Sequence, residues 1–230
     1  MTISHAPVSD AAAAAHRLMR SRRSIRRYLP NAVGRDVLDR LFVSAAAAPS
    51  AHNRQPWRYL VIEEGAAKAA LARAMGERLA ADRTRDGDAE GAIAHDVARS
   101  HARITSAPVL VLVCLTLEET DVYPDEARAR AEFLMAVQST AMATQNLLLA
   151  AHAEGLAACW MCAPLFCPEV VGASLDLPPA WQPQGLITLG PPADAGRDRA
   201  RKPLAAFVRY VATASDRSAG LAAAPVSSAP

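Results

Sequence analysis

The sequence predicts a single α+β domain, and three observations lead to that class. Short runs rich in β-branched and other apolar residues recur along the chain, and each is too short to form a stable helix. Segments with apolar residues at helical spacing separate these runs, and one continues for about 30 residues, from 124 to 153. No internal repeat and no Pro/Gly-rich linker interrupts residues 10–212, so we expect one domain there, between disordered ends at 1–9 and 213–230.

The first half of the chain is expected to alternate helices and strands. A helix begins near Asp36 and stops at Pro49, because proline cannot continue a helix. Its apolar face consists of Val37, Leu38, Leu41, Ala45 and Ala48. The next elements, in order, are a strand at 58–63, a helix at 66–81, a helix at 92–104 and a strand at 108–115. The last strand is apolar throughout, which is typical of a central strand covered on both faces.

The second half is built around the long helix expected at 124–153. Asp125 and Glu126 favour its start and Gly155 closes it. At about 1.5 Å per residue it spans about 45 Å, a length that suits the spine of a dimer. Its seam is predicted to consist of Phe133, Val137, Ala141, Gln145, Leu148 and His152. The remaining elements are a strand at 156–161, a short helix after Pro168, and strands at 185–189 and 207–212.

Composition and charge narrow the classes of partner. The formal net charge of +2 gives no reason to expect a nucleic-acid or membrane partner, since such binding needs a concentrated basic face. No run reaches the roughly 18 apolar residues of a membrane helix, and the alanines at 11–15 lead into His16 and Arg17 rather than into the apolar core of a secretory signal. Four clustered cysteines do not make a secreted disulfide framework, so we expect reduced thiols in a cytoplasmic protein.

An arginine-rich segment is the first candidate for a binding site. Arg22, Arg23 and Arg26 surround Ser24. Guanidinium groups offer forked donors that match phosphate oxygens, and the serine hydroxyl can complete an anion site. The segment alone also fits a solvated basic turn or a nucleic-acid patch, and the patch predicts strongly salt-dependent binding.

A second motif occupies residues 48–57, directly after the first apolar helix. Two prolines stiffen it, whereas Ser50, Asn53 and Gln55 offer donors and acceptors suited to the edge of a heterocycle or to a ribityl chain. The same residues also fit a capped, proline-rich loop whose tryptophan enters the core.

The order and spacing of these motifs resemble the opening of the nitroreductase family. Arg-Arg-Ser-x-Arg is followed by Pro-Ser-x-x-Asn-x-Gln-Pro-Trp, then by residues 154–163 after the long helix and by the basic stretch 199–204. The resemblance covers residues 15–212. It implies an FMN-binding homodimer whose α+β fold has a central mixed or antiparallel sheet, flanking helices and a long helix in the dimer core.

The resemblance also assigns the contacts to FMN. The phosphate and the polar edge of the flavin are assigned to Arg22, Arg23, Ser24, Arg26, Arg199 and Arg201. The other subunit contributes Pro49, Ser50 and Asn53, and Gln55 of the same motif is also counted among the contacts. The central ring is expected to lie beside Trp160, Met161, Cys162 and Ala163, with main-chain N–H groups serving the reactive flavin nitrogen.

The third motif departs from the family in two positions. Cys162 and Ala163 stand where related enzymes often carry an acidic residue and a glycine, so the preferences for donor and substrate stay open. Cys159 and Cys162 have the spacing of a redox CxxC pair, but they end an apparent strand instead of beginning a helix, so we interpret them as packing residues. No fourth metal ligand stands at a suitable spacing, and the scattered histidines do not form a catalytic triad.

The resemblance implies a reaction in which hydride passes from NADH or NADPH through FMN to a nitroaromatic, quinone or other conjugated small molecule, with ping-pong kinetics. Flavin N5 carries the hydride, so no catalytic side chain is expected. One alternative is the reduction of a deazaflavin precursor, because residues 155–185 look closest to the nitroreductase-like domain attached to the γ-glutamyl ligase of coenzyme F420 biosynthesis. Another is a flavin-storage protein in which Trp160 or Met161 blocks the ring face.

Overall fold

A computed structural model describes residues 9–210 of the 230-residue chain. The described chain divides into two compact units, one ending at Arg197 and the other beginning at Asp198. Each unit is described by itself. The disordered ends predicted at 1–9 and 213–230, apart from Ser9, and the predicted domain boundary after residue 212 lie outside the described residues.

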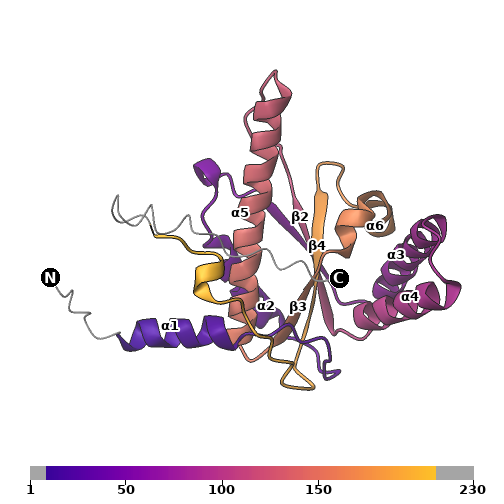
Figure 1. Ribbon diagram of the computed structural model, residues 1–230, viewed down its shortest axis with the longest axis horizontal. Helices are drawn as coiled ribbons and strands as arrows, with labels where there is room; N and C mark the ends of the chain where they lie inside the picture. The colour runs from indigo at the N-terminus through magenta and orange to yellow at the C-terminus, as the bar shows by residue number, and fades with distance from the viewer. Residues whose placement is uncertain (1–8, 211–230) are drawn as a thin grey trace. The chain divides into compact units, whose positions relative to one another are not determined.

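Six α-helices and four strands form the first unit within the described residues (Figure 1). The helices are α1 (Asp10–Ser21), α2 (Arg35–Ala46), α3 (Gly65–Arg85), α4 (Glu90–Thr105), α5 (Glu126–Ala153) and α6 (Pro168–Leu175). The strands are β1 (Trp57–Ile62), β2 (Val109–Leu115), β3 (Ala157–Met161) and β4 (Gln182–Gly190). Two short 3-10 helices, η1 (Ala51–Asn53) and η2 (Ala163–Phe166), belong to the same unit, and a third, η3 (Leu204–Ala206), belongs to the second unit.

The four strands form one antiparallel sheet in the order β1-β2-β4-β3. Strand β2 is buried at every position, which confirms the prediction of a central strand covered on both faces. The pairing of β2 with β4 shifts where Val113 faces Gly185 and Cys114 faces Pro183, so Gln184 is the extra residue of a β-bulge. Strand β3 lies at the edge of the sheet.

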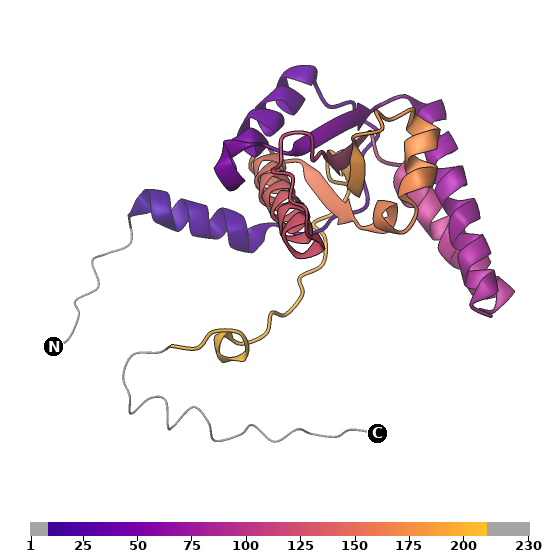
Figure 2. The same ribbon diagram turned by 90° about the horizontal axis from the view of Figure 1, so that it is seen from above.

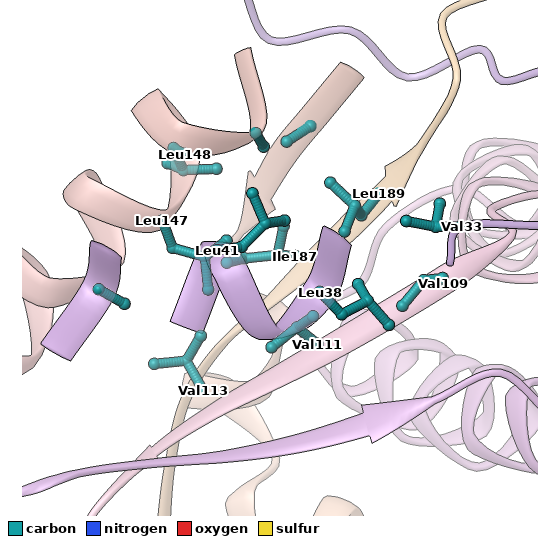
Figure 3. Close-up of a cluster of buried hydrophobic side chains, with 13 residues drawn as sticks. Val33, Leu38, Leu41, Val109, Val111, Val113, Leu147, Leu148, Ile187 and Leu189 are labelled. Atoms are coloured by element: carbon teal, nitrogen blue, oxygen red, sulfur yellow. The ribbon is translucent and has the colours of Figure 1, made fainter. Parts of the chain in front are cut away.

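Helices cover both faces of this sheet, as the view in Figure 2 shows. Helices α2 and α5 cover one face, where Leu38, Leu41 and Leu147 pack on the strand residues Val111 and Ile187 (Figure 3). Helices α3, α4 and α6 cover the other face, with buried side chains that include Leu71, Ile104 and Val171. The two apolar layers on one sheet confirm the predicted α+β class.

The long helix is present, but its predicted seam matches the buried face only at Leu148. Helix α5 has 28 residues and begins after Asp125, whose carboxylate accepts a hydrogen bond from the N–H of Arg128. Its buried face is made mainly of small residues and consists of Glu132, Ala136, Ser139, Thr140, Ala143, Thr144, Leu147, Leu148 and Ala151. Ala141 and Gln145, from the predicted seam, are exposed. Small side chains let α5 approach the sheet closely, and a search for large apolar residues does not find such a face.

Two other predictions differ from the structure. Helix α1 was not predicted because it buries no residue and so leaves no core-facing pattern, although Ser9 caps it by accepting from the N–H of Ala12. The predicted last strand, 207–212, is wrong in its described part. Residues 207–210 are not a strand, and the sheet of the described residues consists of β1, β2, β4 and β3. A strand requires a hydrogen-bonding partner, whatever its sequence pattern.

Candidate functional site

The arginine motif is attached to the edge strand β3. After α1 the chain runs beside β3, where Ser24 makes a parallel bridge with Ala158 and the N–H of Ile25 donates to the carbonyl oxygen of Ala158 at 3.3 Å. The Tyr28 hydroxyl holds this segment, since it lies 2.8 Å from the carbonyl oxygen of Ile25 and 2.6 Å from Oγ1 of Thr188 on β4. Burial raises the pKa of Tyr28, so the phenol stays protonated.

The potential around this motif is positive. Burial and, after it, the charges of Arg22 and Arg23 lower the pKa of His152, whose Nε2 lies 2.8 Å from the Ser21 hydroxyl. Arg23 donates from Nη1 to the carbonyl oxygen of Arg22 at 3.1 Å, so its guanidinium is held close to the main chain. Within residues 9–210, no carboxylate forms a salt bridge with Arg22 or Arg26. This donor set can therefore accept an anion.

Arg103 joins the same positive region and was not found from the sequence. Burial raises the pKa of the Cys159 thiol, and the nearby charges of Arg26 and Arg103 oppose that rise. Arg103 lies in the last turn of α4, far along the chain from the arginine motif. A single arginine on a helix gives no motif, so only the fold reveals that it faces β3.

The third motif occupies the end of the same edge strand. Ala158 directs its carbonyl group outward to Ile25, whereas Cys159 directs its own inward to Thr188. Because these directions alternate along a strand, the main-chain groups of Trp160 also point outward. From Ala158 to Cys162 is four residues, about 13 Å. The arginine motif and residues 160–163 thus lie along one edge of one protomer.

The indole ring of Trp160 makes the main side-chain contacts at the end of β3, with Gly185 and with Cys162. The ring packs on Gly185 of β4 so closely that a Cβ at position 185 would stand 2.7 Å from Cε2 of the indole. Its Nε1 donates to the Cys162 sulfur at 3.0 Å. Cys159 is 1% exposed, whereas Cys162 is exposed, and both are free thiols. Cys159 is therefore packed in the interior, whereas Cys162 stands at the open end of the strand, and its interpretation as a packing residue at the flavin face stays a prediction.

The second motif forms a loop with an unusual backbone. His52, Asn53 and Gln55 have φ of 51°, 55° and 49°, in the left-handed region that costs about 1 to 3 kcal/mol for a residue other than glycine. The Ser50 hydroxyl accepts from the N–H of Gln55 at 3.0 Å, and Arg54 binds Asp121 at 2.7 Å. Strained conformations of this kind are typical of ligand-binding loops.

This loop opens toward solvent. Asn53 and Gln55 are exposed, and with Arg58 they line a hollow of about 310 Å³. Pro49 is exposed and Ser50 is half-buried. The sequence did not indicate that Arg54 and Asp121 hold the loop, because these residues are distant along the chain.

The two halves of the predicted site are far apart in one protomer. The loop packs on α5 near Glu132 and Ser139, whereas the arginine motif meets α5 at His152. The rise of an α-helix places these points about 20 to 30 Å apart. The two segments therefore meet α5 at well-separated points within one protomer. Arg199 and Arg201 lie in the second unit, where both are exposed and Arg201 donates to the carbonyl oxygen of Arg199 at 2.8 Å.

Within residues 9–210, no helix is long and apolar enough to cross a membrane.

Comparison with known proteins identifies the family of this chain. Residues 19–191 match the model of the nitroreductase family. A protein of Thermus thermophilus described as an NADH dehydrogenase is 30% identical over 228 residues, which cover 89% of this chain and 97% of that protein. The 5,6-dimethylbenzimidazole synthase of Rhodobacter capsulatus is 31% identical over 177 residues, 76% of this chain and 82% of the relative.

A solved structure from Desulfovibrio desulfuricans, described as a nitroreductase in complex with FMN, superposes with a TM-score of 0.65. It is 26% identical and covers 91% of this chain and 99% of its own. The sequence match, the shared fold and the placement of the arginine motif agree, and the chain therefore belongs to the nitroreductase family.

Proposed function

We propose that the chain is an FMN-dependent oxidoreductase that takes hydride from NADH or NADPH and passes electrons to a conjugated small molecule. One observation carries this proposal: the arginine motif is bonded to β3, and the outward main-chain groups of Trp160 continue along the same edge. This arrangement offers an anion site at one end and main-chain donors at the other. FMN has a phosphate and a heterocycle separated by a flexible chain, so the residues present fit it.

The roles of the residues follow from their positions on this edge. Arg22, Arg26 and Ser24 would hold the phosphate, with Arg103 adding positive charge. Arg23 shapes the turn through its main-chain bonds. Main-chain N–H groups at 160–163 would orient the ring. Bound FMN supplies the redox chemistry, accepting hydride at N5 and releasing electrons to the acceptor.

The proposed active form is a homodimer with two composite sites. Because the loop at 49–55 lies too far from the arginine motif in one protomer, we assign Pro49, Ser50, Asn53 and Gln55 to the flavin of the partner. Helix α5 offers a surface for such a partner, since Leu134 and Met142 are 44% and 42% exposed on the same face as Ala141. Exposed apolar side chains on a long helix are typical of an interface.

Ping-pong kinetics follow if donor and acceptor use one face of the ring in turn. The acceptor then binds only after the oxidised nicotinamide has left. Initial rates measured at several fixed acceptor concentrations should give parallel lines in a double-reciprocal plot, and intersecting lines would contradict this part of the proposal.

An absorption spectrum of the purified protein tests the proposal directly. The protein should bind FMN, lose the flavin absorbance anaerobically with NADH or NADPH, and regain it with a quinone or a nitroaromatic compound. Failure to bind added FMN would overturn the proposal. Bleaching by reduced F420 alone would support the deazaflavin alternative, and bound flavin that no donor reduces would support storage. Flavin consumed over repeated cycles, instead of regenerated, would indicate a reaction in which FMN is a substrate.

A further inference from the structure

A second hollow lies at the beginning of β4. It is bounded by α6, by the segment leading into β4, by Leu165 of η2 and by Phe133 of α5, and its volume is about 440 Å³. Small-molecule sites commonly have volumes of about 300 to 1,000 Å³. None of the side chains that line it is ionisable, and Phe133, Leu165 and Trp181 give it an apolar character.

Gln184 is the buried polar residue at the edge of this hollow. It is 8% exposed and is the extra residue of the bulge between β2 and β4, a position that re-aims a side chain. Its Nε2 donates to the carbonyl oxygens of Gln182 and Pro183, both at 3.2 Å. Two acceptors on the same side fix the orientation of the amide, so Oε1 points away from them. No hydrogen bond within residues 9–210 uses Oε1.

The hollow begins where the proposed flavin segment ends. Met161, the last residue of β3, faces Leu186 on β4, which stands two residues after Gln184. Ala163 starts η2, which carries Leu165 to the wall of the hollow. A molecule bound against Gln184 is therefore adjacent to residues 160–163.

We propose that this hollow binds an uncharged, aromatic small molecule that carries a hydrogen-bond donor, with Oε1 of Gln184 as the acceptor of that bond. The identification of this molecule as the electron acceptor rests on the proposed function. An apolar lining without a counter-charge penalises anions, since a charged group entering it loses water and gains no partner. Phosphorylated or carboxylated acceptors, such as deazaflavin precursors, are therefore disfavoured. The rings of Phe133 and Trp181 supply aromatic surface for packing.

Binding without turnover tests the hollow independently of any reductase activity. Three probes differ in one group: 4-nitrobenzyl alcohol has a donor, its methyl ether has none, and 4-nitrobenzoate is an anion. Quenching of tryptophan fluorescence, with the Trp181→Phe variant identifying the signal, gives each dissociation constant in the absence of an electron donor. We expect the alcohol to bind about 5-fold more tightly than the ether, and the anion at least about 10-fold more weakly than the alcohol.

The matched variants assign the preference to one side chain. Gln184→Leu should bring the alcohol-to-ether ratio to about 1, whereas Gln138→Leu, on an exposed side chain of α5 outside the hollow, should keep it near 5. The same ratios should appear in kcat/KM when NADH or NADPH reduces the protein.

Three outcomes would overturn the inference. Equal affinity for the anion and the alcohol would exclude an uncharged site, and an unchanged ratio in Gln184→Leu would remove the role of Oε1. Dissociation of a dimer in Trp181→Ala, together with no binding of the probes, would assign the hollow to a second copy of the chain.

If the binding ratios hold but kcat/KM does not follow them, the bound molecule is not the acceptor. If the binding ratios hold and no donor reduces FMN, the hollow stands and the proposed function fails.

Discussion

A composite site predicts that two defective chains restore each other in a mixed dimer. One chain would carry Arg26→Glu, which reverses the charge beside the phosphate. The other would carry Asn53→Gly together with Gln55→Gly, which removes two exposed amides while glycine keeps their left-handed backbone. In the hybrid, one site holds both intact halves and the other site holds neither.

The magnitude follows from the geometry of the halves. In the Arg26→Glu parent, loss of a charge-assisted hydrogen bond with added repulsion costs about 3 kcal/mol, or roughly 100-fold in FMN affinity. In the other parent, loss of two amide hydrogen bonds costs about 2 kcal/mol, or roughly 30-fold. Hybrids isolated through two different affinity tags should then hold about one FMN per dimer, against about two for the natural dimer. At an FMN concentration a few times the natural dissociation constant, each parent homodimer should hold almost none.

Equilibrium dialysis with FMN measures these occupancies, and circular dichroism of each parent checks that it is folded. If folded hybrids hold no FMN, both halves of the site belong to the same chain. That result would refute the assignment that we base on the 20 to 30 Å along α5.

Three further predictions concern single positions. Lys68 is buried and donates to the carbonyl oxygens of Ala107 and Pro108 at 2.9 and 3.0 Å, so Lys68→Met should lower the free energy of unfolding in urea by about 2 to 3 kcal/mol. Arg73→Met, exposed on the same helix, should change it by less than about 0.5 kcal/mol, and an equal effect of the two would contradict this reading. The pKa of His152 is lower in the folded chain than in the unfolded chain, so the folded state binds fewer protons and loses stability as the pH falls below about 6.5. NMR titration should show the low pKa, and a normal value would count against a positive site. Gly185→Ala should displace the Trp160 indole and change its near-ultraviolet dichroism, whereas an unchanged spectrum would show that the ring contact is loose.

The sequence predicted the elements that bury apolar residues and missed those that do not. Strand β2 and helix α2 follow directly from apolar periodicity, because a pattern of burial is visible in the residue types. Helix α1 buries nothing, and the buried face of α5 is made of small residues, so neither leaves that pattern.

For the candidate site, the sequence supplied motifs but not their distances. The two motifs follow each other in the chain, yet Ser21 contacts α5 at His152 and Arg54 lies beside Glu132, and only the fold shows this. Arg103 reaches β3 from a distant helix without any motif. The positive φ of His52 was also invisible, since glycine or asparagine would be the usual signal for it.

Strand β3 has a consequence for how this protein behaves in the absence of a ligand. Beyond the bridge at Ser24, the outer edge of β3 has main-chain donors and acceptors that form no hydrogen bonds with another described strand. An open strand edge is a template on which another chain can add a strand, and this is a common route to aggregation. Under the proposed binding mode FMN covers that edge, so bound cofactor also prevents another chain from pairing with it and keeps the protein in solution. Preparations stripped of flavin should therefore precipitate sooner than loaded ones at equal concentration.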